Sequence, residues 1–214
     1  MKQKNKKIKT WLLLICLTVT SSLLMSVSTA NTPDIKAFQA IINDLQQRFP
    51  NSPQDPIIVI SAGEQRLFLI KDHKVVASHL ISTAEAGLGS QRGSNKTPLG
   101  VHRVSQKFGK GAKAGTIFKA RQNTRKVAQI LTQPGARSNA DNVTSRILWL
   151  SGLEPGVNKG GKVDSHARYI YIHGTDEEGR LGKPASHGCI RMKNTAVIDL
   201  FKQVPVGTLV DIVE

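Results

Sequence analysis

The sequence predicts a mainly β domain with one or two short helices, preceded by an N-terminal amphipathic helix. From residue 57 onward, short runs of β-branched and apolar residues alternate with turn-like segments, which is typical of strands in a sheet. Helical periodicity is found near the start of this region and near its end. A chain of 214 residues can bury one good core, so we expect a single folded domain.

The first 30 residues have the pattern of an export signal. Five lysines and no acid precede or border an apolar run at residues 11–24, and the segment ends in the small residues Ser28, Thr29 and Ala30. This order predicts a signal peptide over residues 1–30, cleaved after Ala30. An uncleaved anchor is the alternative, although residues 11–27 are barely long enough to span a bilayer.

Residues 31–55 are expected to form a helix and a linker. Pro33 and Asp34 open the helix, and Pro50 and Pro53 end it. Its apolar residues fall on one face, and they are Ile35, Phe38, Ile41, Ile42, Leu45 and Phe49. Such a stripe is most often used for packing, so the helix should dock on the body of the protein.

The expected domain begins with three apolar runs, at residues 57–60, 66–70 and 74–77, which predict an antiparallel meander. Further strands are expected at Thr116–Lys119 and at residues 146–150, 169–173 and 208–213. Residues Asn194–Gln203 should form a helix, with Asn194 as its N-cap and Pro205 just past its end.

The formal charge of +15 falls to +10 without the first 30 residues. Between Arg92 and Arg146 there are twelve basic residues and a single acid, Asp141. This segment is either a solvated positive surface or the site of an anionic partner. Nucleic acid is excluded by the export signal and by the scarcity of aromatic residues for base stacking. The glycines of residues 87–93 lack the spacing and the following helix of a nucleotide-binding loop.

Cys189 is the only cysteine after residue 30, so no intramolecular disulfide is expected in the exported chain. Acyl transfer by a thiol needs a thiolate, a nearby imidazole and N–H donors for the oxyanion. An imidazole and a position just before a helix would both increase the thiolate fraction of Cys189. A buried, inert cysteine is the alternative. A zinc site built from His173, His187 and Cys189 is disfavoured by their spacing.

The segment Ser186-His187-Gly188-Cys189-Ile190-Arg191, preceded by His173-Gly174-Thr175 at a strand end, resembles the signature of the YkuD-type L,D-transpeptidase catalytic domain. The sequences Thr-Pro-Leu-Gly at residues 97–100 and Glu-Gln-Arg-Leu-Phe-Leu at residues 64–69 also match that family. The resemblance covers residues 56–214. It implies an L,D-transpeptidase-like β-sandwich domain.

The resemblance also implies roles for individual residues. Cys189 would be the nucleophile, activated by His173, and the Gly188 and Cys189 N–H groups would bind the oxyanion. Arg191 would hold a substrate carboxylate or the loop itself. The residues expected to shape the nucleophile loop are Ser186, His187 and Gly188. No metal or organic cofactor is expected. Many members have Asn at the position of Arg191, so substrate preference is not carried over. Trp149 is the only tryptophan after residue 30, so no glycan-stacking platform is expected.

The function implied is that of an exported cysteine acyltransferase acting on peptidoglycan stem peptides in the periplasm or cell envelope. Cys189 would form a thioester with release of the terminal D-alanine, and an amine from another stem, or from a protein lysine, would resolve it. One alternative is an L,D-carboxypeptidase or link-cutting hydrolase on the same scaffold. Another is a non-enzymatic cell-wall binding module. The membrane would be met only through the export signal.

The loop between His173 and Ser186 is charged and punctuated by glycines. Its three acids are expected either to attract a cationic acceptor amine or to be solvated, and they are Asp176, Glu177 and Glu178.

Overall fold

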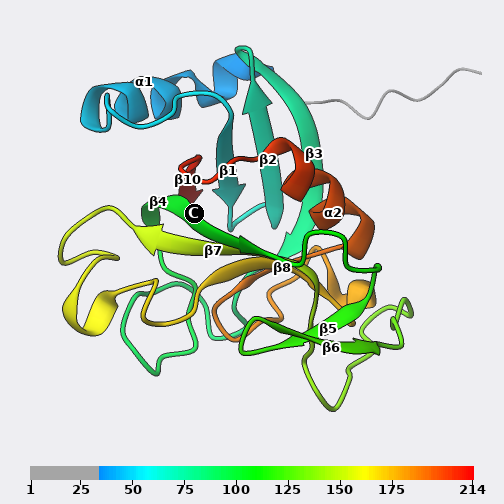
Figure 1. Cartoon of the computed structure of the whole chain (residues 1–214). Coiled ribbons are helices and arrows are strands. Elements are labelled where there is room, and N and C mark those ends of the chain that lie inside the picture. Colours follow the sequence, from blue (N-terminus) through cyan, green and yellow to red (C-terminus); the bar gives the residue numbers. More distant parts are fainter. Residues whose placement is uncertain (1–33) are drawn as a thin grey trace, which may run out of the picture. The chain divides into compact units, whose positions relative to one another are not determined.

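The computed structural model describes residues 34–214, and the expected export signal lies outside them. The described part is mainly β, which confirms the predicted fold class (Figure 1). Its helices are α1 (Gln39–Arg48) and α2 (Asn194–Gln203), with short 3-10 turns η1 (Ile35–Phe38), η2 (Gly161–Val163) and η3 (Glu178–Arg180). Its strands are β1 (Ile57–Ser61), β2 (Arg66–Lys71), β3 (Lys74–Ser82), β4 (Gly100–Phe108), β5 (Thr116–Lys119), β6 (Gln122–Val127), β7 (Val143–Gly152), β8 (Tyr171–Thr175), β9 (Ile190–Met192) and β10 (Leu209–Val213).

The strands form one sheet that closes on itself. Its order is β4-β10-β1-β2-β3-β9-β8-β7-β5-β6, and β4 also pairs with β7. The expected meander is confirmed, because β1, β2 and β3 pair in antiparallel order. Two parallel pairs, β1–β10 and β8–β9, join segments distant in sequence. The two packed layers expected of a sandwich are thus parts of one continuous sheet, with the β5–β6 hairpin extending from β7.

Strands β1 and β2 are buried on both faces, which explains their unbroken apolar runs. Ile58 and Ile60 of β1 face the central core inside the closed sheet. Ile57 and Val59, on the opposite face, pack against the N-terminal helix. The α1 stripe docks there as expected, with Phe38 and Phe68 ring centroids 4.9 Å apart. Within residues 34–214 no helix is long and apolar enough to span a membrane.

Helix α2 has the expected bounds and contributes Val197, Leu200 and Phe201 to the central core. The expectation that Asn194 caps it is wrong. Lys193 is the N-cap residue and has no side-chain capping bond. The Asn194 side chain is instead buried and accepts hydrogen bonds from the hydroxyls of Thr144 (2.6 Å) and Ser145 (2.5 Å). Two buried hydroxyl groups near the start of β7 are thereby satisfied, which takes precedence over capping in a buried site.

Three strands were not expected from the sequence. β4 contains many polar residues, so it lacks the apolar pattern of a buried strand. One of them, His102, is buried with its Nε2 2.9 Å from Ser165 Oγ. β6 is almost wholly polar, and the three residues of β9 are too few to show a period. β9 matters most for the site, because it lies between Cys189 and α2. Cys189 therefore comes immediately before a strand and not before the helix N-terminus, contrary to expectation.

A buried carboxyl group lies near the docked helix. Asp211 on β10 is 9% exposed, and burial raises its pKa to about 6, with Glu154 and Asp44 adding to the effect and Arg48 opposing it. Arg48 itself pairs with Asp44 (2.7 Å) and with Glu154, which ties α1 to the sheet. Because the folded pKa exceeds the ordinary value of 3.8, ionisation of Asp211 opposes folding at neutral pH.

Asp211→Asn should therefore stabilise the protein at pH 7.5 by roughly 1–3 kcal/mol, since each pKa unit corresponds to about 1.4 kcal/mol. At a pH of about 3 or below, Asp211 is mostly neutral in both states, so the difference should vanish. Urea unfolding at both pH values measures this, with the exposed Asp199→Asn as the matched control. Equal stabilisation at both pH values would attribute the effect to packing instead of ionisation.

Candidate active site

The turn that carries the expected nucleophile is held by backbone hydrogen bonds to residues 83–85. The N–H groups of Ala185 and Ser186 both donate to Thr83 O, at 2.8 and 2.9 Å. Glu85 N–H donates in return to Ser186 O at 2.9 Å. The turn is therefore attached to the end of β3 before the chain reaches Cys189.

Thr97, the first residue of the Thr-Pro-Leu-Gly segment, completes this attachment. It is fully buried, and its hydroxyl donates to Gly188 O at 3.0 Å. The Thr97 hydroxyl oxygen also accepts a hydrogen bond from the Ala84 N–H at 2.9 Å. One hydroxyl thus joins the segment that follows β3 to the residue before Cys189. This is the structural use of a motif that the sequence alone left without a role.

Gly188 and Ser186 shape the turn itself. Gly188 has φ of +127°, and an added Cβ would lie 3.3 Å from both Ile170 Cδ1 and Lys96 O, so other residues would be strained there. Ser186 Oγ donates to Cys189 O (2.5 Å) and accepts from the Gly188 N–H (3.2 Å). Of the two expected oxyanion donors, Gly188 N–H is therefore occupied. The Cys189 N–H has no hydrogen-bond acceptor within residues 34–214, so it is available to bind an oxyanion.

Cys189 is partly exposed, and it is the free cysteine of the described residues. Its thiol donates to Tyr169 O at 3.3 Å, and Tyr171 N–H donates to its sulfur at 3.4 Å. Burial of the sulfur raises its pKa to about 11, against the lowering effects of the Tyr171 N–H and of Arg191 and Arg168. The expected increase in thiolate fraction is thus wrong for the resting site, because desolvation dominates and no helix N-terminus is present.

His173 is 3% exposed on β8, and its Nδ1 lies 2.7 Å from Gly174 O. A carbonyl only accepts, so Nδ1 carries the proton and Nε2 is left with a free lone pair. Burial lowers the pKa of His173 to about 4, so the ring is neutral at pH 7. Neutral imidazole with a bare Nε2 is the form that a general base requires.

His173 and Cys189 lie on the same face of neighbouring strands. In the parallel β8–β9 register His173 is opposite Arg191, and Ile172 is opposite Ile190. Ile172 and Ile190 face the central core, so His173 and Arg191 face the other way, as does Cys189 beside Tyr171. The two groups are adjacent in register, and no hydrogen bond joins the ring to the sulfur within residues 34–214.

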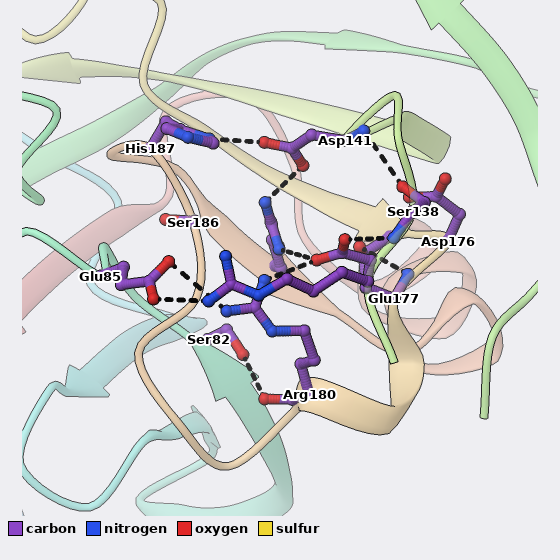
Figure 2. A network of polar contacts seen from close by, with 12 residues as sticks. Ser82, Glu85, Ser138, Asp141, Asp176, Glu177, Arg180, Ser186 and His187 are labelled. Atoms are coloured by element: carbon purple, nitrogen blue, oxygen red, sulfur yellow. Dashed lines mark hydrogen bonds and ion pairs between the residues drawn. The ribbon is translucent and has the colours of Figure 1, made fainter. Parts of the chain in front are cut away.

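Arg191 is the largest fully buried side chain among the described residues. Its guanidinium pairs with Glu177 at 2.8 Å and with Asp141, both drawn in Figure 2. Both carboxylates lie on loops, and each also pairs with a second side chain, Glu177 with Arg180 and Asp141 with His187. A guanidinium so enclosed holds the loops around β9. The substrate contact expected for Arg191 stays a prediction, and these contacts favour its other expected role, that of holding the loop.

His187 lies at the surface of the site. It is 69% exposed, and its Nδ1 is 2.7 Å from Asp141 Oδ2. Burial alone would raise the pKa of Asp141, but Arg191 and His187 beside it bring that pKa below its ordinary value. Figure 2 shows Asp141 pointing toward His187 on one side and toward the buried arginine network on the other. Asp141 therefore connects the exposed imidazole to the buried ion pairs.

The three loop acids are not free to attract an acceptor amine. Asp176 is 1% exposed and accepts from the Asn142 backbone and side chain, at 3.1 and 2.7 Å. Glu177 is paired with Arg191 and with Arg180 (2.9 Å). Glu178 accepts from the backbone and side chain of Asn194, at 2.8 and 2.7 Å. Both expected roles are wrong, because buried donors occupy all three carboxylates.

A cavity of about 290 Å³ lies beside the nucleophile turn. Its lining includes Arg92, Arg168, Tyr169 and His187, and Tyr169 O is the group that accepts from the Cys189 thiol. Arg168 donates to Lys96 O at 2.6 Å, which anchors one cation of the cavity. The cavity therefore carries two arginines and suits a substrate that carries a carboxylate.

Aromatic residues form the other side of the site. The Trp149 ring is 7% exposed and stacks on His166 with centroids 3.9 Å apart. The Arg121 guanidinium covers it at 4.5 Å and donates to Tyr171 Oη at 2.9 Å. The indole is thus enclosed by side chains and contributes to the wall behind Cys189.

Sequence reasoning missed Asp141 as a site residue, although a signal was present. Asp141 is the single acid among the twelve bases of residues 92–146. An isolated acid in so basic a segment has a strong Coulombic reason to pair. Tyr169 and Tyr171 gave no such signal, because they act through their backbone. Within residues 34–214 no group of three His, Cys, Asp or Glu side chains is arranged to hold a metal ion.

Two known bacterial proteins are similar to this chain in sequence. YqjB of Bacillus subtilis (strain 168), named as an L,D-transpeptidase, is 27% identical over 158 residues, which are 74% of this chain and 71% of YqjB. YcfS of Escherichia coli (strain K12), also named as an L,D-transpeptidase, is 27% identical over 170 residues. They are 79% of this chain but 47% of YcfS, so the chain spans about half of that relative.

Among solved structures, L,D-transpeptidase 3 from Mycobacterium tuberculosis in complex with a faropenem-derived adduct matches with a TM-score of 0.46. It is 16% identical and covers 75% of this chain and 60% of its own. The sequence model of the YkuD family, described as the L,D-transpeptidase catalytic domain, matches residues 55–212. That match takes in both strands of the site and the whole nucleophile turn, and the chain belongs to the YkuD family of L,D-transpeptidase catalytic domains.

Proposed function

We propose that the chain is an exported L,D-transpeptidase that acts on peptidoglycan stem peptides in the periplasm or cell envelope. Cys189 attacks the carbonyl carbon of the third stem residue, and the C–N bond to the terminal D-alanine breaks. The D-alanine leaves as a free amino acid and a thioester remains on the sulfur. An acceptor amine, from another stem or from a protein lysine, then displaces the sulfur and forms a new amide. No metal or organic cofactor takes part.

The observation that carries this proposal is the environment of the Cys189 sulfur. The thiol is presented by a turn that three backbone hydrogen bonds and the Thr97 hydroxyl hold in place. The Cys189 N–H, which has no acceptor within residues 34–214, belongs to the same residue as the sulfur and would be available as an oxyanion donor. The arginine-lined cavity next to Tyr169 suits the carboxylates of a stem peptide. The Cys189 sulfur is thus held in position, with an N–H group for the oxyanion and a positively charged cavity for the substrate.

The pKa values support a particular order of proton movement. With a thiol pKa of about 11 and a His173 pKa of about 4, the resting pair is neutral at pH 7. The S–H proton therefore moves to His173 Nε2 as the sulfur attacks, and the same nitrogen returns it to the leaving amine. Bound substrate excludes water and closes the separation between ring and sulfur, as catalytic contacts commonly tighten on binding.

The activity is tested with a purified tetrapeptide stem and an acceptor amine, by mass spectrometry of the products. The expected products are cross-linked dimer and free D-alanine, both lost in Cys189→Ala. Imipenem should add its full mass to the wild-type chain and none to Cys189→Ala. Tripeptide as the sole product at every acceptor concentration would make the chain an L,D-carboxypeptidase. An intact, unreacted stem with no imipenem adduct would favour the non-enzymatic binding module.

The role of His173 predicts a split between two reactions of the same sulfur. His173→Gln should slow acylation by the stem peptide by about 10²–10⁴, the usual contribution of a general base. It should leave the pH profile of iodoacetamide alkylation almost unchanged, because a neutral ring does not stabilise the thiolate. In both proteins the alkylation rate should still rise above pH 9, toward the pKa of about 11. The half-buried His79→Gln is the matched control. A wild-type plateau by about pH 8 would indicate an imidazolium–thiolate pair instead.

The attachment through Thr97 predicts that its hydroxyl matters for catalysis. Thr97→Val leaves Ala84 N–H and Gly188 O unpaired, which should cost roughly 1–3 kcal/mol of stability. A nucleophile displaced by about 1 Å should also lower kcat on the order of 10²-fold. Thr208→Val is a matched control, since the Thr208 hydroxyl is buried with no partner. Thr97→Ser should recover most of the activity. Equal kcat in Thr97→Val and wild type would remove Thr97 from the site.

A further inference from the structure

A second cavity, of about 550 Å³, lies between the end of β4 and the last turn of α2, which are side by side in Figure 1. We call it the α2 pocket. It shares no lining residue with the cavity beside Cys189, and its lining residues are Lys107, Lys110, Gly111, Arg146, Phe201 and Lys202. Four of these six residues are cations, and none is an acid.

The cations of the α2 pocket are not neutralised within the described residues, apart from Lys202, which pairs with Asp199 at 3.0 Å. Arg146 is 7% exposed, and its Nη1 donates to two carbonyl oxygens, those of Ala112 (2.8 Å) and Ser145 (2.6 Å). Burial lowers the pKa of Arg146, and no carboxylate acts to raise it. Carbonyls supply hydrogen bonds but no countercharge. A buried cation without an anion is costly, so an anion in the cavity would relieve it.

Lys107 adds a second charge at the same place. Its ammonium donates to Phe201 O (2.7 Å) and Val204 O (2.6 Å), which leaves one of its three N–H groups. It lies 4.2 Å from the centre of the Phe201 ring, and the Arg146 guanidinium lies 5.5 Å from the same centre. One ring therefore holds two cations at one cavity, and the exposed Lys110 adds a third at the rim.

We propose that the α2 pocket binds a phosphate group carried by a larger organic molecule. Three unpaired cations exceed what one carboxylate neutralises, whereas a phosphate has up to two charges and several acceptor oxygens. Arg146 offers its remaining guanidinium N–H groups as a fork, and the lysines act as point charges. The cavity is larger than a phosphate alone, and the Phe201 ring provides apolar surface for the attached group. A soluble phosphomonoester offers this group with up to two charges, and a phosphodiester lipid headgroup offers it with one.

The test measures the binding of two probes to the full chain. Glycerol 3-phosphate is titrated by calorimetry at low salt, and co-sedimentation is measured with vesicles of phosphatidylglycerol and phosphatidylcholine against pure phosphatidylcholine. Lys110→Gln should weaken binding about fivefold or more, and Arg146→Gln about tenfold or more. Lys74→Gln, an equal loss of charge on exposed β3, should change it less than about twofold. If Arg146→Gln fails to fold, the binding measured for Lys110→Gln and Lys202→Gln tests the proposal.

Glycerol 3-phosphate binding that Lys110→Gln weakens supports a soluble ligand. Binding to the phosphatidylglycerol vesicles alone, with the same loss, supports a headgroup. Binding of neither probe overturns the proposal, and so does a loss that is as large in Lys74→Gln. Transfer between soluble stem peptides should be unchanged in Lys110→Gln, so failure of this site and failure of the Cys189 activity are seen separately.

Discussion

The buried guanidinium of Arg191 is the interaction on which the arrangement of this site depends. A charge enclosed to that degree must be paired, and breaking such a pair leaves an uncompensated charge that costs about 3–5 kcal/mol. Its partners, Asp141 and Glu177, lie on separate loops, and Glu177 also accepts from Arg180 and from Ser138 N–H. One cation two residues after the nucleophile therefore organises both loops around it.

Burial also determines the protonation state of the Cys189 sulfur. Arg191 and Arg168 favour a thiolate at Cys189, but desolvation of the sulfur exceeds their effect and the resting group is a thiol. A rise of about two pKa units makes the thiolate roughly 3 kcal/mol less accessible than in a free cysteine. A neutral thiol is protected from chance oxidation and alkylation, because both require thiolate. Under the proposed function, reaction depends on a substrate that brings His173 and the sulfur together.

Local signals in the sequence predicted the parts of the fold that local physics decides. The apolar runs at residues 57–60 and 66–70 and the α2 period predicted their elements, because both faces of those strands are buried and α2 has one apolar face. The signature around Cys189 predicted the family, which the match over residues 55–212 confirms. The ion partners of Arg191 could not be predicted, since Asp141 is distant in sequence and only the sheet brings it near. For the same reason Asn194 was misread as a cap.

The basic segment at residues 92–146 gains its meaning only from this topology. In sequence its twelve cations form one positive stretch. In the fold, Arg92 lies at the cavity beside the nucleophile turn, whereas Lys107, Lys110 and Arg146 lie at the α2 pocket. The antiparallel pairing of β4 with β7 gathers the second group, because it places the end of β4 beside the first half of β7, and Lys107 there reaches α2. A solvated surface would not need Arg146 to be buried. Arg146 at the α2 pocket is buried without a carboxylate partner, whereas Arg92 at the other cavity is exposed, so the two groups of cations differ in burial as well as in place.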